Sequence, residues 1–538
     1  MVKLFLFYYK LYDNIKKCYN NIGKNRISKK FKYNLGVITF MNNKVLIAVI
    51  AIIIICAGAF ALTNSGNTGS ASIDANALED RGKLVVDSES LDENKGLYHT
   101  DSADTNAVLV KNGGALKLAD SIINKTGDTA TSGDDADFYG VNSAVLVNTN
   151  GTLDISNVEI NTNSKGSNGI FVTNSEASSD SSSPQGSGEG GQPPEVAGNG
   201  GGDGGQPPEA QGSGEGGQPP EAGGEQPGAS TVEGTTEATI NNVKITTHSD
   251  KSRGLDATYN GIINAENVII NTDGQSCAAL ATDRGEGQVH VKNSEINTGV
   301  SKDSGRGSPL IYSTGNITAE NTKGTAYVSQ IACIEGKNSI ELTDCDLTGY
   351  AQGNRQDDED TWVDLGGVFI YQSMSGDADV GTSQFSAKNS KLAIAEDSSV
   401  YSEAPMFHVT NTACVINLDN TELSFGSGTF LEIASQNQWG SEGSNGGVAE
   451  LNTDNEKIDG NVIVDSISSL TWNMENTEFK GMVNSTGNTT VNVGSGSTWT
   501  LTGDSSVSAL SVSGNIDYGE YKLTVNGQTY DSSNPYNG

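Results

Sequence analysis

The sequence has few basic residues, few aromatic residues and few histidines. Among its 538 residues, 32 lysines and arginines stand against 66 aspartates and glutamates, a formal net charge of -34. A field of this sign repels phosphate backbones, so it argues against nucleic acid as a partner. The four histidines are scattered singly, which argues against a zinc site and against a Ser-His catalytic pair. Aromatics make up only 6% of the chain while Gly, Ser, Thr and Asn are plentiful, a composition that favours short strands and turns over helices.

Basic residues are concentrated in the first 44 positions, where Asp13 is the only acid. The next segment, VLIAVIAIIIICAGAFAL at 45–62, carries no charge and is just long enough to cross a bilayer as a helix. The basic flank predicts a cytoplasmic start, so everything after Leu62 is expected outside the cell.

Two alternatives stay open at this end of the chain. Read from Met41, the segment has a short basic start, an apolar run and an Ala59-Phe60-Ala61 ending, which also suits a cleavable signal peptide. The chain is therefore expected either to be anchored at the extracellular face of the membrane or to be secreted. Translation is expected to start at Met1 or at Met41.

An internal repeat dominates the rest of the sequence. Segments such as LDISNVEI, ATINNVKI and INLDNTEL share an Asn or Asp at their fifth place, and apolar residues stand four before, two before and three after it. We call this recurring Asn or Asp the ladder residue, and it is found at Asp120, Asn157, Asn242, Asn267, Asn293, Asn321, Asp344, Asn389, Asn420 and Asn476. Apolar residues at minus four and minus two follow the two-residue period of a strand. The next apolar residue stands at plus three, which breaks this alternation and predicts that the chain turns a corner at the ladder residue. We expect the ladder amides to satisfy buried backbone groups of that corner.

A second short strand is predicted between successive ladder residues. Its proposed inward column is Leu109, Leu146, Phe171, Leu255, Leu280, Leu310, Cys333, Phe369 and Phe407. The spacing of 25, 26, 28 and 23 residues from Asn242 to Asp344, with no helical period, predicts an all-β, single-stranded parallel β-helix. In that fold each strand pairs with its equivalent one coil along, about 4.8 Å away.

From Lys83 to about Tyr530 these columns resemble the right-handed parallel β-helix of pectate lyases and of adhesin-like surface proteins from anaerobic microbes. The segments ATDRGEGQVHVKNSEINT, YQSMSGDADVGTS and GSTWTLTGD resemble surface β-helix proteins of the carbohydrate-binding kind. The resemblance implies display outside the cell and contact with sugars. The Arg and Pro spacing of pectate lyases is missing, which argues against lyase activity.

Four arginines in predicted loops are the candidate ligand-binding residues. Arg253, Arg306 and Arg355 fall 11, 13 and 11 places after their ladder residues, so these three are expected on one face, and Arg284 falls 17 places after. With Asp256, Asp283 and Asp303 nearby, they predict either a groove that binds acidic sugars through guanidinium forks or, the interpretation that we favour, salt-bridged turns on a solvated surface. Trp439, Tyr312, Tyr371 and Tyr401 are the aromatic candidates for stacking on a sugar ring, with ordinary packing as the alternative.

Acidic runs supply the only candidate metal ligands. Asp134, Asp135 and Asp137, and likewise Asp357, Asp358 and Asp360, offer the hard oxygens that calcium prefers. Neither run has a fixed loop signature, so a solvated acidic loop is the alternative. Of the later cysteines, Cys333 falls in the proposed inward column, which predicts a buried apolar residue rather than a disulfide.

The stretch around GGQPPE carries eight of the eleven prolines, from Pro184 to Pro227. Because GIFVTN before it and ATINNVKI after it complete one coil, it predicts a disordered loop inside a single solenoid rather than a linker. The expected organisation is a basic segment at 1–44, an apolar span at 45–62, a linker at 63–82, a β-helix at 83–530 interrupted at 176–234, and a tail at 531–538.

Three functions remain open. We expect a surface-anchored or secreted binding protein for polysaccharide, without a catalytic set. The alternatives are a polysaccharide lyase or hydrolase, motivated by fold analogy alone, and a purely structural envelope protein. No cofactor is implied apart from calcium at the acidic runs.

Overall fold

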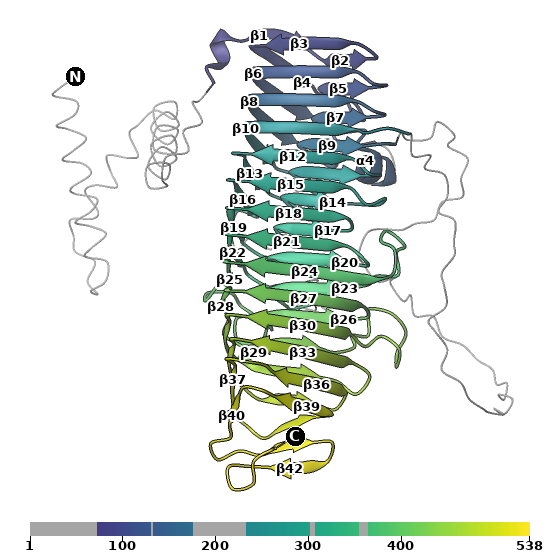
Figure 1. The fold of residues 1–538 in the computed structure, drawn as a ribbon. Coiled ribbons are helices and arrows are strands. Elements are labelled where there is room, and N and C mark those ends of the chain that lie inside the picture. The colour runs from purple at the N-terminus through teal and green to yellow at the C-terminus, as the bar shows by residue number, and fades with distance from the viewer. Residues whose placement is uncertain (1–72, 131–132, 176–232, 302–306, 354–363, 538) are drawn as a thin grey trace, which may run out of the picture. The chain divides into compact units, whose positions relative to one another are not determined.

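The computed structural model describes residues 73–130, 133–175, 233–301, 307–353 and 364–537. Within them nearly all regular structure is β, and the strands wind as a parallel β-helix (Figure 1). All pairs of named strands there are parallel except the closing hairpin of β41 (Leu523–Val525) with β42 (Gln528–Tyr530). The short elements besides strands are η1 (Ala75–Ala77) and α4 (Gly133–Tyr139).

Two long sheets, here called the first and the second sheet, form the walls of the solenoid. Three strands of the first sheet run through a corner: β6 (Ala115–Thr126), β8 (Thr152–Asn163) and β10 (Glu237–Thr247). Before the corner lie β3 (Ser90–Asn94), β12 (Ile262–Glu266), β15 (Gln288–Lys292), β18 (Asn316–Glu320), β21 (Ser339–Thr343), β24 (Thr382–Lys388), β27 (Ala413–Asp419), β30 (Val448–Asp454), β33 (Ser469–Glu475), β36 (Asn488–Val493) and β39 (Ala509–Val512). Past the corner lie β1 (Glu79–Gly82), β4 (Gly96–Thr100), β13 (Ile269–Thr272), β16 (Glu295–Thr298), β19 (Lys323–Ala326), β22 (Asp346–Gly349), β25 (Lys391–Ile394) and β28 (Glu422–Ser424).

The second sheet supplies the opposite wall. It consists of β2 (Leu84–Asp87), β5 (Val108–Lys111), β7 (Val145–Asn148), β9 (Ile170–Thr173), β11 (Leu255–Thr258), β14 (Leu280–Thr282), β17 (Ile311–Ser313), β20 (Ala332–Glu335), β23 (Val368–Tyr371), β26 (Phe407–Thr410), β29 (Thr429–Ile433), β32 (Asn461–Val464) and β35 (Val483–Ser485). Two small sheets complete the carboxyl end: β31 (Lys457–Asp459), β34 (Glu478–Lys480), β37 (Thr498–Thr500) and β40 (Asn515–Asp517), and β38 (Ser505–Val507) with the hairpin.

The predicted corner lies at the ladder residues. All ten have a positive φ of 46° to 56°, and Asn455 at φ 55° adds a position that the pattern had missed. This left-handed conformation suits Asn and Asp better than other residues with a Cβ, which explains why they recur there. Neighbouring amides are linked, as where Asn242 Nδ2 donates to Asn157 Oδ1 at 2.6 Å. The backbone conformation is therefore the main reason for the ladder.

The expectation that the ladder amides satisfy buried groups is wrong, because nearly all these side chains are exposed. In some coils the residue that follows the ladder residue satisfies a buried backbone group instead. Ser294 Oγ accepts the N–H of Val268 at 3.1 Å, and Ser390 Oγ accepts the N–H of Cys345 at 3.1 Å, both in buried surroundings. Where a serine follows the ladder residue it thus closes the corner from the inside, whereas a valine stands there in other coils, as at Val158 and Val243.

Side chains between the walls form one continuous core. In the carboxyl-terminal half, aromatic rings stack along the axis in the order Phe385, Phe407, Phe430, Trp472, Phe479 and Trp499, with centroids 4.6 to 6.0 Å apart. These contacts join rings within a coil, as with Trp472 and Phe479, and between coils, and burial of aromatic surface is among the strongest stabilising terms in a core.

Residues 70–538 form one compact unit. Strand β8 pairs directly with β10, as with Leu153 opposite Ala238, so one sheet continues across the Gly/Pro-rich stretch.

Residues 176–232 of the predicted loop lie outside the described residues, as does the apolar span at 45–62. In the described ranges, no helix is long and apolar enough to cross a membrane. The first strand, β1, starts before Lys83, so the solenoid takes in the end of the expected linker.

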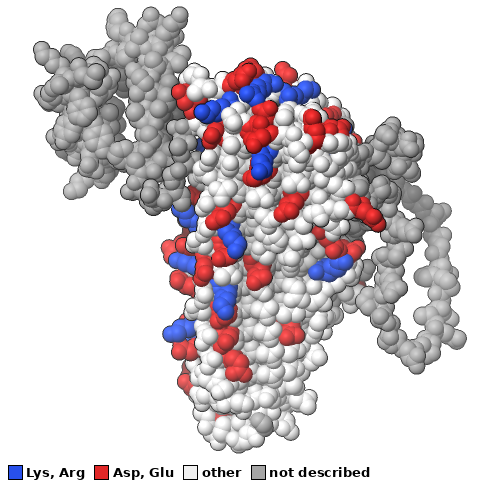
Figure 2. Space-filling model, turned by 45° about the horizontal axis from the view of Figure 1, so that its top comes forward, with Lys and Arg blue, Asp and Glu red and all other residues white. Residues whose placement is uncertain are grey.

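Opposite charges alternate along the corner edge of the solenoid, where red and blue side chains follow one another in Figure 2. Lys292 Nζ lies 2.7 Å from Glu320 Oε2, and Lys388 Nζ lies 2.9 Å from Asp419 Oδ2. Because these pairs join neighbouring coils at the surface, each is worth well under about 1 kcal/mol, but together they favour the observed register.

Candidate functional site

The outer face of the second sheet is buried over its middle coils, which is unusual for a sheet surface. Strand register aligns an outward column of Leu109, Leu146, Phe171, Asp256, Ala281, Tyr312, Cys333, Phe369 and His408. Phe171 and Asp256 are wholly buried and His408 is 4% exposed, whereas Val85 at the amino-terminal end of the same column is 50% exposed. We call the buried part, from Leu146 to His408, the covered face.

This register corrects the predicted column of the second strand. Phe171 pairs with Asp256, and Leu255 pairs with Ile170, so the proposed column mixed inward and outward residues. Cys333 faces outward and is buried in a small cluster with Phe369 and Tyr371, outside the main core. The error has a physical cause: the covered face is itself apolar in several coils, so hydrophobicity alone could not tell the two faces apart.

Helix α4 covers the upper part of this face. It lies beside β9 and β14 at the edge of the solenoid (Figure 1). Gly140 ends it in a left-handed conformation, and a Cβ there would come within 2.5 Å of the Phe171 ring. Thr258 Oγ1 donates to the carbonyl of Phe138 at 2.9 Å, and the rings of Tyr139 and Tyr259 stack at 5.5 Å. The helix is thus held to the sheet by its backbone and by its side chains.

Beneath α4, Arg253 is the centre of a buried ionic cluster. Its Nη2 lies 2.7 Å from Asp283 Oδ2, its Nε lies 3.4 Å from Asp256 Oδ2, and its Nη1 lies 3.3 Å from Asp137 Oδ1. Lys251 Nζ lies 3.0 Å from the other oxygen of Asp137. These five side chains are called the arginine cluster below. The predicted neighbours Asp256 and Asp283 do lie against Arg253.

The arginine cluster contains three carboxyl groups but only two basic groups. Burial raises the pKa of both Asp256 and Asp283 above the usual range for aspartate, and the attraction of Arg253 opposes that rise. Both oxygens of Asp256 are buried without a hydrogen-bond donor among the described residues. Ionisation of one of these two carboxyls disfavours ionisation of the other, so their protonation is linked.

Arg284 belongs to the same region. Its Nη2 and Nε lie 2.5 and 3.1 Å from Asp377 Oδ1, and its guanidinium carbon lies 3.9 Å from the centre of the Phe138 ring. The structure therefore brings Arg253, Arg284 and Asp137 together under and around one helix. Both guanidinium groups lie against aspartates of the chain itself, Arg253 against Asp283 and Arg284 against Asp377.

Glu335 forms a second buried polar group, further along the covered face. It accepts hydrogen bonds from Tyr312 at 2.7 Å, from Tyr371 at 3.1 Å and from Ser373. Burial raises the pKa of Glu335, and these hydrogen bonds oppose the rise. Tyr312 and Tyr371 were candidates for stacking on sugars, but here their hydroxyls hold a buried carboxyl.

An open pocket lies at the carboxyl-terminal end of the covered face. It has a volume of about 390 Å³ and is walled by side chains from β26, from β29 and from the segments before β23, before β26 and after β29. Its polar lining consists of Asp364, Glu403, His408, Glu432, Ser435, Gln436, Asn437 and Gln438. His408 Nδ1 lies 2.9 Å from the carbonyl oxygen of Leu365, and Gln436 Nε2 lies 2.9 Å from His408 Nε2. We call this the His408 pocket.

Trp439 stands behind this pocket. Its indole N–H donates to Asp364 Oδ1 at 2.8 Å, and its ring lies against Tyr371 with centroids 4.7 Å apart. Gln438 Nε2 donates to the same carboxylate oxygen at 2.8 Å. Trp439 thus positions Asp364 at the pocket wall, several coils away from the arginine cluster.

The remaining predicted ligand and metal residues are only partly described. Arg306, Arg355, Asp357, Asp358 and Asp360 lie outside the described residues, as do Asp303 and the side chain of Asp134. Asp135 and Asp137 lie on α4, where Asp137 pairs with Lys251 and Arg253. Within the described ranges no group of three or more His, Cys, Asp or Glu side chains is arranged to hold a metal ion. Cys277, Cys333, Cys345 and Cys414 are all buried.

Sequence reasoning missed Glu335, Asp364 and His408 as members of a site. Each lies in or beside a short strand of the second sheet, where a charged or imidazole side chain interrupts apolar neighbours, as Glu335 does in IACIEG and His408 in PMFHVT. That interruption was the available signal. No protein-family model matches the chain, and a search of curated proteins finds none with significant similarity.

Proposed function

We propose that this chain is a surface-displayed β-helix that binds carbohydrate without transforming it, and that the His408 pocket is its sugar site. The observation that carries the proposal is the pocket lining, in which carboxylates, carboxamides and one imidazole converge in about 390 Å³. Such planar donors and acceptors suit the paired hydroxyls of a sugar. Display would be at the outer face of the membrane if 45–62 is retained, or in the medium if it is cleaved.

The lining also indicates the class of sugar. Among the described residues that line it there is no lysine or arginine, whereas Asp364, Glu403 and Glu432 supply negative charge. A uronic acid would meet like charge there, so the pocket favours neutral or amino sugars. The acidic-sugar ligand that the arginines predicted is less well supported, because Arg253 and Arg284 pair with aspartates inside the chain.

A pull-down with residues 70–538 tests the proposal against a panel of insoluble neutral, amino and acidic polysaccharides. We expect retention on a neutral or amino polymer and loss of retention when Gln436→Ala and Glu432→Ala are combined. Gln528→Ala, an exposed glutamine of the closing hairpin, is the matched control. Retention on no polymer would contradict the proposal and favour a purely structural envelope protein.

A hydrolase is the second candidate, and Asp256 with Asp283 favours it. The two carboxyls lie on neighbouring coils around one arginine, and burial raises the pKa of each. Such a pair can act as general acid and base. Release of reducing ends that Asp283→Asn abolishes would establish this activity. Unsaturated product from polygalacturonate with calcium would indicate the lyase form instead.

A further inference from the structure

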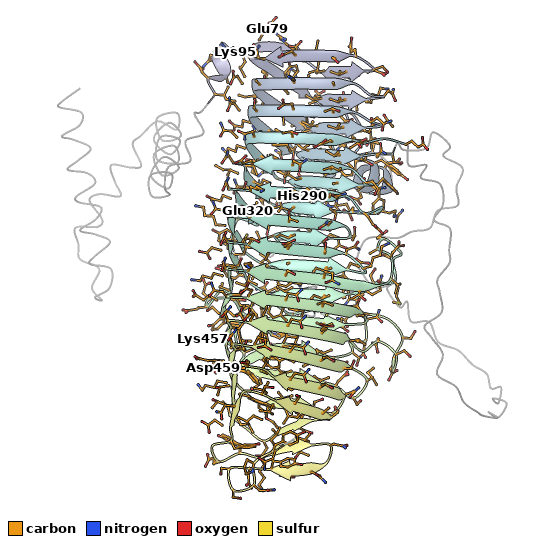
Figure 3. The ribbon with its side chains drawn as sticks, viewed as in Figure 1. Glu79, Lys95, His290, Glu320, Lys457 and Asp459 are labelled. Carbon is orange, nitrogen blue, oxygen red and sulfur yellow. The ribbon has the colours of Figure 1, made fainter. Side chains whose placement is uncertain are left out.

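A groove runs along the outer face of the first sheet, on the wall opposite the covered face. It has a volume of about 430 Å³ and spans five coils, from β21 through β24, β27 and β30 to β33. Its floor is a column of carboxamides, Asn417, Asn452 and Asn473. We call it the amide groove. The same column continues toward the amino end with His290, which Figure 3 labels on this face.

The carboxamides of the floor are linked in one direction. Asn452 Nδ2 donates to Asn417 Oδ1 at 3.0 Å, Asn473 Nδ2 donates to Asn452 Oδ1 at 2.8 Å, and Asn492 Nδ2 donates to Asn473 Oδ1 at 2.7 Å. A carboxamide oxygen has two lone pairs, so each retains one acceptor position for a ligand. The chain of bonds fixes these acceptors one per coil, which lowers the ordering cost of binding.

One wall of the groove is acidic. Asp419, Asp454 and Glu475 are directly aligned on successive coils of the first sheet. Toward the amino end the same column alternates in sign, as with Lys292 beside Glu320, which Figure 3 labels, and Lys388 beside Asp419. After Asp419 the alternation stops, and like charges lie opposite one another, an arrangement that destabilises a sheet unless a cation offsets it.

Spacing decides between the extended ligands that could lie there. Coils repeat every 4.8 Å or so, whereas an extended peptide advances about 3.3 Å per residue and would fall out of register within a few coils. An extended β-1,4-linked polysaccharide advances by about one coil per sugar unit and turns over at each unit, so Asn417, Asn452 and Asn473 can meet successive units through different groups of the sugar. The charge of the wall repels acidic polymers and attracts protonated amines.

We propose that the amide groove binds an extended amino-sugar polymer along the solenoid axis, with its hydroxyl and ammonium groups donating to the carboxamides and to Asp454 and Glu475, the two acids of this wall beyond the Lys388–Asp419 pair. This inference deepens the proposed function, on which it rests, by adding a second site with a defined ligand class. The two sites differ in extent. The His408 pocket holds a short sugar segment, whereas the groove follows a chain over five coils.

The test is calorimetry of residues 70–538 with β-1,4-linked glucosamine oligomers of increasing length. We expect the affinity to rise with length until about five units fill the groove. Asp454→Asn combined with Glu475→Gln should weaken the longer oligomers about ten-fold, which is the loss of about 1.4 kcal/mol for two partly exposed ion pairs. Glu478→Gln, on the other side of the same corner, is the matched control and should change nothing.

The outcomes separate the two proposals. Affinity that is independent of length, or that Glu475→Gln and Glu478→Gln lower equally, overturns the groove. If Gln436→Ala with Glu432→Ala abolishes binding while the groove variants bind normally, the groove inference fails and the proposed function stands. If the groove variants alone lose binding, the groove stands and the assignment of the His408 pocket fails. Binding of no oligomer or polymer contradicts both.

Discussion

Arg253 Nη2 lies 2.7 Å from Asp283 Oδ2, and the two side chains are only 11% and 7% exposed. Such a pair is strongly coupled to its surroundings, because removing one partner leaves the other charge buried. The same guanidinium also faces Asp256 and Asp137. Arg253 therefore compensates the charge of acids that belong to three separate segments, including α4.

Replacing Arg253 with leucine should destabilise the β-helix by about 3 to 5 kcal/mol, since Asp256 and Asp283 would remain buried without a counter-charge. Chemical denaturation of residues 70–538 measures this. Adding Asp256→Asn and Asp283→Asn to the leucine variant should recover part of the loss. A single Arg253→Leu variant as stable as the parent would show that the cluster is hydrated rather than buried.

The corner ladder predicts a contrast between two asparagines of one segment. Asn420 has φ 55° at the corner, whereas Asn417 lies within the extended strand β27. Asn420→Val should lower the free energy of unfolding by roughly 1 to 3 kcal/mol, because a β-branched residue is strained in the left-handed region, and Asn420→Gly should lower it less. Asn417→Val suits a strand and should be tolerated. Equal effects at both positions would contradict the conformational explanation.

Glu456 predicts how stability depends on pH. It is 1% exposed in the column that closes the corner, where it accepts the N–H of Thr421 at 2.7 Å, and burial raises its pKa to about 8. The folded state therefore keeps this proton while the unfolded chain loses it near pH 4.5, so its contribution to stability falls as pH rises from there to about 8.

Glu456→Gln should remove that loss, making the variant more stable than the parent at about pH 9 by on the order of a few kcal/mol and nearly equal to it below about pH 4.5. Denaturation midpoints at both pH values measure the difference. The exposed Glu478→Gln serves as the control for removing one charge. A Glu456→Gln variant with the parent's pH profile would mean that Glu456 ionises normally in the fold.

The Gly/Pro-rich stretch should be dispensable for folding. On its two sides, Thr236 Oγ1 donates to Asn174 Oδ1 at 2.7 Å, so the flanking chain ends already meet. Replacing 176–232 with a short turn should leave the cooperative transition intact and shift stability only slightly, since closure entropy changes slowly with loop length. Thermal unfolding followed by circular dichroism tests this. Loss of the cooperative transition would contradict a single solenoid.

The corner could be predicted because one residue type meets one conformational demand in every coil, and the register of the first sheet followed from it. The sequence could not show which residues of the second-sheet strands face inward. Because α4 and the segments around Ser373 and Trp439 bury the outer face of that sheet, both faces carry apolar residues. The Arg253–Asp256–Asp283 grouping was visible from spacing. The His408 pocket was not, because its residues come from three stretches, 364–365, 403–408 and 432–438, that meet only after folding.

The central claim is that carbohydrate binds at the His408 pocket, and hydrogen exchange with a retained oligosaccharide tests it most directly. We predict slower exchange of backbone amides in 434–438 and in β26 and β29, with Gln436→Ala plus Glu432→Ala abolishing the protection. Protection confined to other coils, or no protection by any neutral or amino sugar that the chain retains, would contradict the claim.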